Sequence, residues 1–72
     1  MSHFKMDICD IRQAAIAWKI RHNPPLHEFR DFVVHFANDN GYRVTGSFID
    51  EEFFEVHFST AEVIRFHRQQ LR

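Results

Sequence analysis

The chain has 72 residues, of which 44% are hydrophobic and 15% aromatic, and its formal net charge is -1. This length holds one domain, the composition is not that of a disordered chain, and no apolar run approaches the roughly 20 residues of a membrane span. Residues 1–10 lack the apolar stretch of a signal peptide and Cys9 is the only cysteine, so we expect a single compact intracellular domain over residues 1–72, without disulfides or membrane contact.

A first helix is predicted over residues 7–22. Apolar residues recur there at intervals of three and four, which places them on one helical face: Ile8, Ile11, Ala15 and Trp18. Asp7 suits the N-cap position, because its carboxylate can accept hydrogen bonds from the free amides of the first turn. Pro24 and Pro25 end the helix, since proline has no backbone amide to donate.

A second helix is predicted to begin at or just after Pro25. The same spacing gives it a buried stripe: Leu26, Phe29, Val33, Phe36 and Ala37. Asn40 and Gly41 end this helix, because glycine readily adopts the left-handed conformation of a C-terminal cap. Tyr42 is then placed to fold back on the last helical turn.

A β-hairpin is predicted from Tyr42 to Phe58, where the period of hydrophobicity changes to two. The residues expected to face the core are Val44, Gly46 and Phe48 in the first strand and Phe54, Val56 and Phe58 in the second. Phe53, Glu55 and His57 then point to the opposite face. If the register slipped by one residue, Phe53 and Phe54 would exchange roles.

A third helix is predicted to follow the hairpin, because residues 59–62 read Ser-Thr-Ala-Glu, the pattern of a capping box. This helix would run to about residue 71 and bury Val63, Ile64, His67 and Leu71. The expected fold is therefore α+β, a small single domain of order α-α-β-β-α in which helices cover a two-stranded antiparallel hairpin. Residues 2–6 are either frayed or a short added strand.

Catalytic, cofactor and metal sites are not expected. Cys9 has no glycine-rich loop near it that could form an oxyanion hole, and the sequence contains neither CxxC nor HExxH. His27, Asp31 and His35 are four residues apart and could converge on a metal, but an ordinary polar helix face has the same spacing. We therefore expect no enzyme, no cofactor and no metal ligand.

The distribution of charge predicts an interaction surface. Residues 42–62 carry five acids and one base, and a phenylalanine that faces away from the core lies beside these acids. An exposed aromatic group with a charged rim is typical of a protein interface. The residues expected to contact another protein, or a second copy of the chain, are Ile49, Asp50, Glu51, Glu52, Phe53, Glu55 and His57.

The alternative is a nucleic-acid-binding regulator. It would use a basic patch on the predicted C-terminal helix, formed by Arg65, Arg68 and Arg72. Acidic residues on the second helix and in the hairpin would repel phosphate groups, so a non-enzymatic protein-binding module is the better interpretation. Inhibitors and accessory factors of phages and bacteria often have this size and mixed charge, which is a similarity of scale alone.

Overall fold

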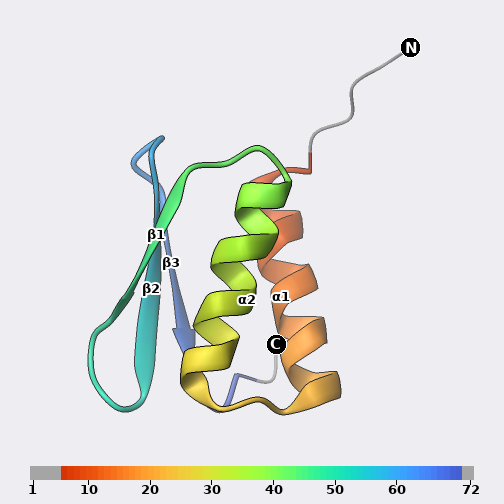
Figure 1. Cartoon of the computed structure of the whole chain (residues 1–72), viewed down its shortest axis with the longest axis vertical. Helices are drawn as coiled ribbons and strands as arrows, with labels where there is room; N and C mark the ends of the chain where they lie inside the picture. The colour runs from red at the N-terminus through yellow and green to blue at the C-terminus, as the bar shows by residue number, and fades with distance from the viewer. Residues whose placement is uncertain (1–5, 71–72) are drawn as a thin grey trace.

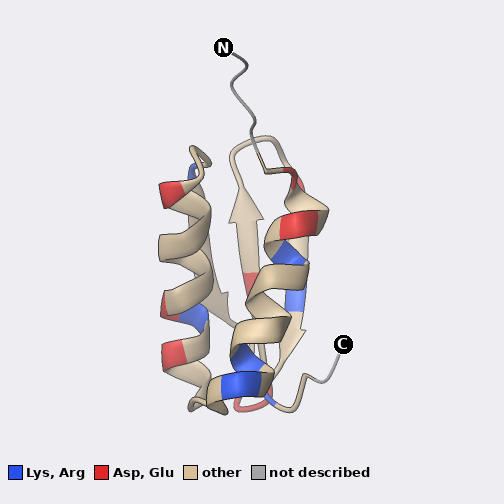
Figure 2. Ribbon diagram, turned by 90° about the vertical axis from the view of Figure 1, so that its right-hand side faces the viewer, with Lys and Arg blue, Asp and Glu red and all other residues tan. Residues whose placement is uncertain are grey.

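The computed structural model describes residues 6–70, which form two helices followed by a three-stranded antiparallel sheet (Figure 1). The elements in chain order are α1 (Ile8–His22), α2 (Leu26–Asp39), β1 (Val44–Phe48), β2 (Phe53–Phe58) and β3 (Val63–His67). The two helices lie side by side on one face of the sheet (Figure 2). The α+β class is thus confirmed, but the order is α-α-β-β-β.

Helix α1 begins and ends where the sequence predicts. The carboxylate of Asp7 accepts a hydrogen bond from the amide of Asp10 at 2.9 Å. At the other end, Asn23 adopts a φ of 46°, a left-handed conformation that asparagine tolerates, and its amide donates to the carbonyl of Lys19 at 2.7 Å. Pro24 and Pro25 follow and prevent the helix from continuing.

Helix α2 ends in the predicted cap. Gly41 has a φ of 89°, and its amide donates to the carbonyl of Asn38 at 3.0 Å. The amide of Tyr42 then donates to the carbonyl of Ala37 at 3.0 Å, so the chain folds back over the last turn. The side-chain amide of Asn40 donates to another carbonyl of that turn.

The second strand of the hairpin has the predicted inner and outer faces. Phe54 and Val56 are fully inaccessible to solvent and Phe58 is buried, whereas Phe53 is half-buried on the opposite face. Phe54 lies opposite Phe48 in the β1–β2 pairing. The alternative register, in which Phe53 and Phe54 exchange roles, is therefore wrong.

Strand β1 is less buried than the sequence predicts. Val44 and Gly46 are only partly covered, and Phe48 is 45% exposed, so the assignment of Phe48 to the core is wrong. The reason is that β1 is an edge strand whose inner face meets the side chain of Arg30. The guanidinium of Arg30 lies 4.6 Å from the centre of the Phe48 ring, and its aliphatic stem lies against Gly46.

The prediction of a third helix is wrong, because residues 63–67 form β3. The connection before it is a tight turn in which the amide of Phe58 donates to the carbonyl of Glu62 at 2.9 Å. Ala61 has a φ of 82° in this turn, which no helix could accommodate. The hydroxyl of Thr60 donates to the Glu62 carboxylate, so these polar side chains bond within the turn and do not cap a helix.

The side chains of β3 explain why it is a strand. Ile64 and Phe66 are buried, while Val63 and Arg65, which alternate with them, are exposed, as expected of a strand with one covered face. Pairing with β2 satisfies the backbone groups of β3 that face β2 and adds two apolar side chains to the core. A helix would have turned Ile64 and Phe66 about 200° apart.

Part of the expected structure lies outside the described residues. This holds for residues 2–5 of the expected N-terminal strand, for Leu71 and for Arg72, while Met6 belongs to no strand. Among the described residues, no helix combines the length and the hydropathy that crossing a bilayer requires.

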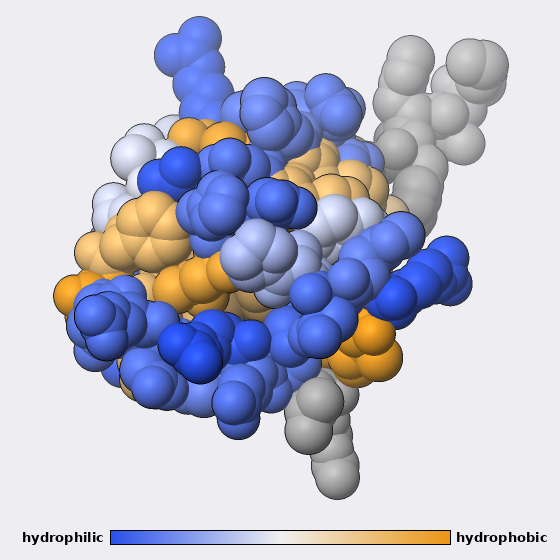
Figure 3. All heavy atoms as spheres, turned by 60° about the horizontal axis from the view of Figure 1, so that its bottom comes forward, coloured by the Kyte–Doolittle hydropathy of each residue, from blue (hydrophilic) through white to orange (hydrophobic). Residues whose placement is uncertain are grey.

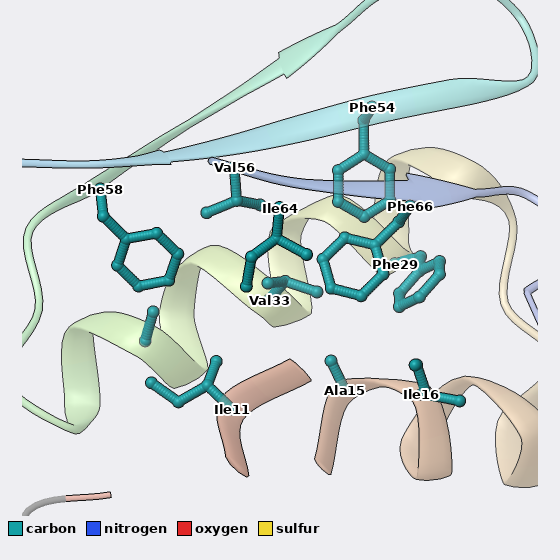
Figure 4. Packing of buried hydrophobic residues seen from close by; sticks show 11 residues of the cluster. Ile11, Ala15, Ile16, Phe29, Val33, Phe54, Val56, Phe58, Ile64 and Phe66 are labelled. Carbon is teal, nitrogen blue, oxygen red and sulfur yellow. The ribbon is translucent and has the colours of Figure 1, made fainter. Parts of the chain in front are cut away.

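Three fully buried phenylalanines hold the helices against the sheet (Figure 4). Phe29 of α2 lies 5.1 Å from Phe54 and 5.1 Å from Phe66, and these two rings are 5.1 Å from each other. Burying one such side chain stabilises the fold by about 1.5–3 kcal/mol, and each aromatic pair adds about 0.5–1.5 kcal/mol. The other buried apolar residues are Ile11, Ala15, Ile16, Val33, Ala37, Val56, Phe58 and Ile64.

Candidate interaction surface

The face of the sheet that points away from the helices, here called the outer sheet face, carries three of the predicted binding residues, Phe53, Glu55 and His57. They alternate along the central strand β2, so the pleat of the strand aims them all away from the core. The residues paired with them complete the face: Thr45 and Ser47 from β1, and Val63, Arg65 and His67 from β3. No helix among residues 6–70 covers this face (Figure 1).

Glu55 is the centre of the charged network on the outer sheet face. Its carboxylate accepts from the guanidinium of Arg65 at 3.0 Å and lies 3.0 Å from Nε2 of His57. The hydrogen bond from Arg65 lowers the pKa of the Glu55 carboxyl, and His57 lowers this pKa further, while partial burial opposes both. Glu55 is therefore held ionised and in place on the surface.

Phe53 is framed by two residues of β3. Its ring meets the ring of His67 edge to face with centroids 4.7 Å apart, and the Arg65 guanidinium lies 5.8 Å from its centre. Nδ1 of His67 accepts from the amide of Gln69, so the neutral ring carries its proton on Nε2, which donates to Glu52 at 2.9 Å. These bonds fix the orientation of the ring that supports Phe53.

The three acids at the hairpin tip have different roles. The carboxylate of Asp50 accepts from the amides of Glu52 and Phe53, at 2.7 and 3.1 Å, and so shapes the turn. Glu52 is the partner of His67. Glu51 is exposed, and its side chain makes no hydrogen bond or ion pair with any residue of the described chain. Glu51 is thus the tip acid whose charge is available to a partner.

Apolar side chains are exposed beside these charges. Ile49 is 46% exposed and Val63 is 49% exposed. The amide of Ile49 donates to the carbonyl of Phe53 at 3.0 Å, so Ile49 extends the outer sheet face towards the tip. The space-filling view of the end that carries the tip shows apolar groups exposed between hydrophilic ones (Figure 3).

Sequence reasoning missed the contribution of β3 to this surface. Val63 and His67 were assigned to the buried stripe of a helix, and Arg65 to its basic side, whereas the structure places all three on the outer sheet face. The signal that could have found them is the alternation in residues 63–67, Val-Ile-Arg-Phe-His, in which every second residue is apolar and large.

The helix predicted to carry the basic patch is a strand over residues 63–67. Arg65 lies on β3 and is paired with Glu55, while Arg68 follows the strand and its amide donates to the carbonyl of Glu52 at 2.7 Å. Arg72 lies outside the described residues. The helix that would have aligned these three arginines is absent from residues 6–70.

The remaining candidates for chemistry are dispersed. His27 is near Glu28 and Asp31 is paired with Arg30, so neither is oriented towards a shared metal position with His35. Within residues 6–70, no three histidine, cysteine or acidic side chains are grouped as metal ligands would be. Cys9 is an exposed free thiol in the first turn of α1.

Comparison of this chain with protein-family models, with curated protein sequences and with solved structures finds no match.

Proposed function

We propose that this chain is a non-enzymatic protein-binding module that contacts a partner protein through its outer sheet face and hairpin tip. The observation that supports this most strongly is the environment of Phe53. This aromatic side chain lies on the sheet face without a helical cover, yet His67 and Arg65 hold it in a defined orientation. A rigid, partly exposed aromatic residue is the kind of anchor that contributes much of the energy in protein interfaces.

The apolar groups around this anchor suit a protein partner. Ile49 and Val63 expose about half of their surface at different ends of the outer sheet face. Together with Phe53 they offer apolar contact area, while Glu55, His57 and Arg65 between them are polar. A surface that mixes apolar and charged groups in this way resembles the composition of non-obligate protein interfaces.

The charges of the surface select a partner with basic side chains. Glu55 is already paired and fixed, so little side-chain entropy is lost when it is covered. Glu51 at the tip has no partner within residues 6–70 and would attract a lysine or arginine. We therefore assign the occupant as a protein that presents a basic side chain to the tip and an apolar side chain to Phe53.

Reversal of the Glu51 charge tests this assignment. The full chain and the variants Glu51→Lys and Asp39→Lys would be immobilised and exposed to lysate of the native host, and a retained protein would then be purified and titrated. Asp39 is the matched control, because it is an exposed acid at the end of α2 that lies away from the hairpin tip (Figure 1).

Glu51→Lys should weaken the purified complex by about 30-fold at low salt, because a charge pair near 4 Å in water is worth about 1 kcal/mol and turning attraction into repulsion costs about 2 kcal/mol. Asp39→Lys should leave the affinity unchanged, and added salt should reduce the difference. An equal change in affinity for Glu51→Lys and Asp39→Lys would contradict the proposal. Light scattering that shows a dimer, lost in Glu51→Lys, would assign the surface to a second copy of the chain.

A further inference from the structure

An open cavity of about 430 Å³ lies where α1 ends, α2 begins and the chain leaves β3. Its walls combine two basic side chains, Lys19 and Arg68, with the apolar surfaces of Pro24, Pro25 and Leu26. No acidic side chain is among the described residues that line it. Figure 2 shows lysine and arginine residues gathered at this end of α1.

Lys19 is the unusual residue of this cavity. It is only 5% exposed, although it makes no hydrogen bond or ion pair with any residue between 6 and 70. No buried side-chain nitrogen or oxygen atom of the described chain lacks a hydrogen-bond partner, so the unpaired ammonium must keep contact with solvent in the cavity. The structure thus buries the aliphatic stem of Lys19 and presents its charge to the cavity.

The start of α2 adds further donors at the same place. Pro25 is the N-cap and provides no side-chain hydrogen bond, and the first two amides of the helix, those of Leu26 and His27, have no acceptor among the described residues. The positive end of the helix dipole therefore lies at the cavity, where the only acid in the first turn of α2 is Glu28, an exposed residue outside the cavity lining. The negative end of the α1 dipole lies nearby and is offset by the basic residues of its last turn, Lys19 and Arg21.

From these observations we infer that the cavity binds a small-molecule oxyanion with two negative charges, a phosphate group. Lys19 and Arg68 supply two positive charges, and the uncapped amides of α2 supply hydrogen bonds of the kind that helix starts donate to phosphate. Pro24, Pro25 and Leu26 offer an apolar wall to an organic body attached to the phosphate. This site is separate from the outer sheet face and independent of the function proposed for that face.

Titration of the full chain with two probes tests the inference. Inorganic phosphate and phenyl phosphate would be added while the amide resonances of Leu26 and His27 are followed by NMR. Both resonances should shift in a saturable manner, and tighter binding of phenyl phosphate would identify an organic phosphate as the natural ligand, whereas equal binding would identify the free ion. An equal concentration of sodium chloride should not reproduce the shifts.

Three variants make the result specific. Lys19→Met and Arg68→Gln should each weaken binding by about tenfold or more, the value of a hydrogen bond to a charged group, and Arg21→Gln should not weaken it, because Arg21 is an exposed base of α1 outside the cavity. Lys19→Met should leave the thermal unfolding temperature nearly unchanged, since methionine keeps an apolar stem in the buried position and removes only the charge that faces the cavity. Arg68 is exposed, so Arg68→Gln tests binding even if the other variant does not fold. Absence of saturable shifts, or an equal loss in Arg21→Gln, would overturn the inference.

Discussion

Ala61 lies in the turn between β2 and β3 with a φ of 82°, and replacing it with glycine should stabilise the protein. A left-handed conformation costs an L-residue about 1–2 kcal/mol, and glycine avoids this cost while losing about 0.5–1 kcal/mol through its greater freedom in the unfolded chain. Ala61→Gly should therefore raise the free energy of unfolding by about 0.5–1 kcal/mol. Urea denaturation followed by circular dichroism would measure the change.

The matched control is Ala17→Gly, the same chemical change at an exposed position within α1. It should lower the free energy of unfolding by about 1 kcal/mol, because glycine is a poor helix former. If residues 59–62 instead began a helix, Ala61 would lie in its first turn and Ala61→Gly would also destabilise the protein. Destabilisation by both variants would therefore refute the assignment of this segment to a β-turn.

Two further predictions concern the sheet. Gly46→Ala should destabilise the fold by about 1–3 kcal/mol, because a Cβ atom there would lie 2.8 Å from Cγ of Arg30 and 2.9 Å from Cγ2 of Val34, a typical overpacking conflict. Arg65→Gln should lower the free energy of unfolding at about pH 7, where Glu55 is ionised, and the difference from wild type should disappear as the pH falls through the folded-state pKa of Glu55. Since Arg65 lowers this pKa from its ordinary value of 4.5, the interaction contributes stability above that pH and is lost below it. Denaturant titrations at about pH 7 measure the change for both variants. For Arg65→Gln the titration is repeated at a pH below the folded-state pKa of Glu55.

The controls for these predictions are on the same strands. Ser47→Ala, at an exposed position of β1, should change the free energy of unfolding by less than about 0.5 kcal/mol. A loss for Ser47→Ala as large as that for Gly46→Ala would mean that close packing of α2 against β1 is not the cause. A difference between Arg65→Gln and wild type that persists unchanged at acid pH would show that Arg65 does not act through the Glu55 charge.

The first half of the fold could be predicted from the sequence because its boundaries are encoded locally. Asp7 caps α1, Pro24 and Pro25 end it, and Gly41 supplies the left-handed residue after α2. Each of these signals depends on the conformational preference of one or two residues. Alternation alone also identified Phe54 as the inward member of the Phe-Phe pair, because one side of β2 is fully covered.

The last element could not be predicted because its local signals favour two structures. Residues 59–62 match a capping box, and the alternation in residues 63–67 is too short to outweigh that signal. The deciding interaction is long-range, since β3 gains its hydrogen bonds from β2 and buries Phe66 against Phe29 and Phe54. Pairing of this kind overrides weak local preference.

The error in the last element carried over to the candidate surface. Arg65 and His67 are the residues that support Phe53 and hold Glu55, yet both were placed on a helix. Lys19 was missed for another reason, because it lies four residues after Ala15 on the buried face of α1. A lysine at such a position can bury its aliphatic stem against the core or turn its whole side chain into solvent, and the sequence does not distinguish these outcomes.

The most direct test of the proposed interaction surface is the affinity of the captured partner for Phe53→Ser, measured together with its thermal stability. Phe48→Ser is the matched control, because Phe48 is 45% exposed on the opposite face of the same hairpin. We expect Phe53→Ser to weaken binding by about 30-fold or more, as for an interface anchor, and to cost about 1 kcal/mol of stability or less. Phe48→Ser should leave binding intact. Unchanged affinity for Phe53→Ser, or an equal loss in both variants, would contradict the assignment of the outer sheet face as the binding surface.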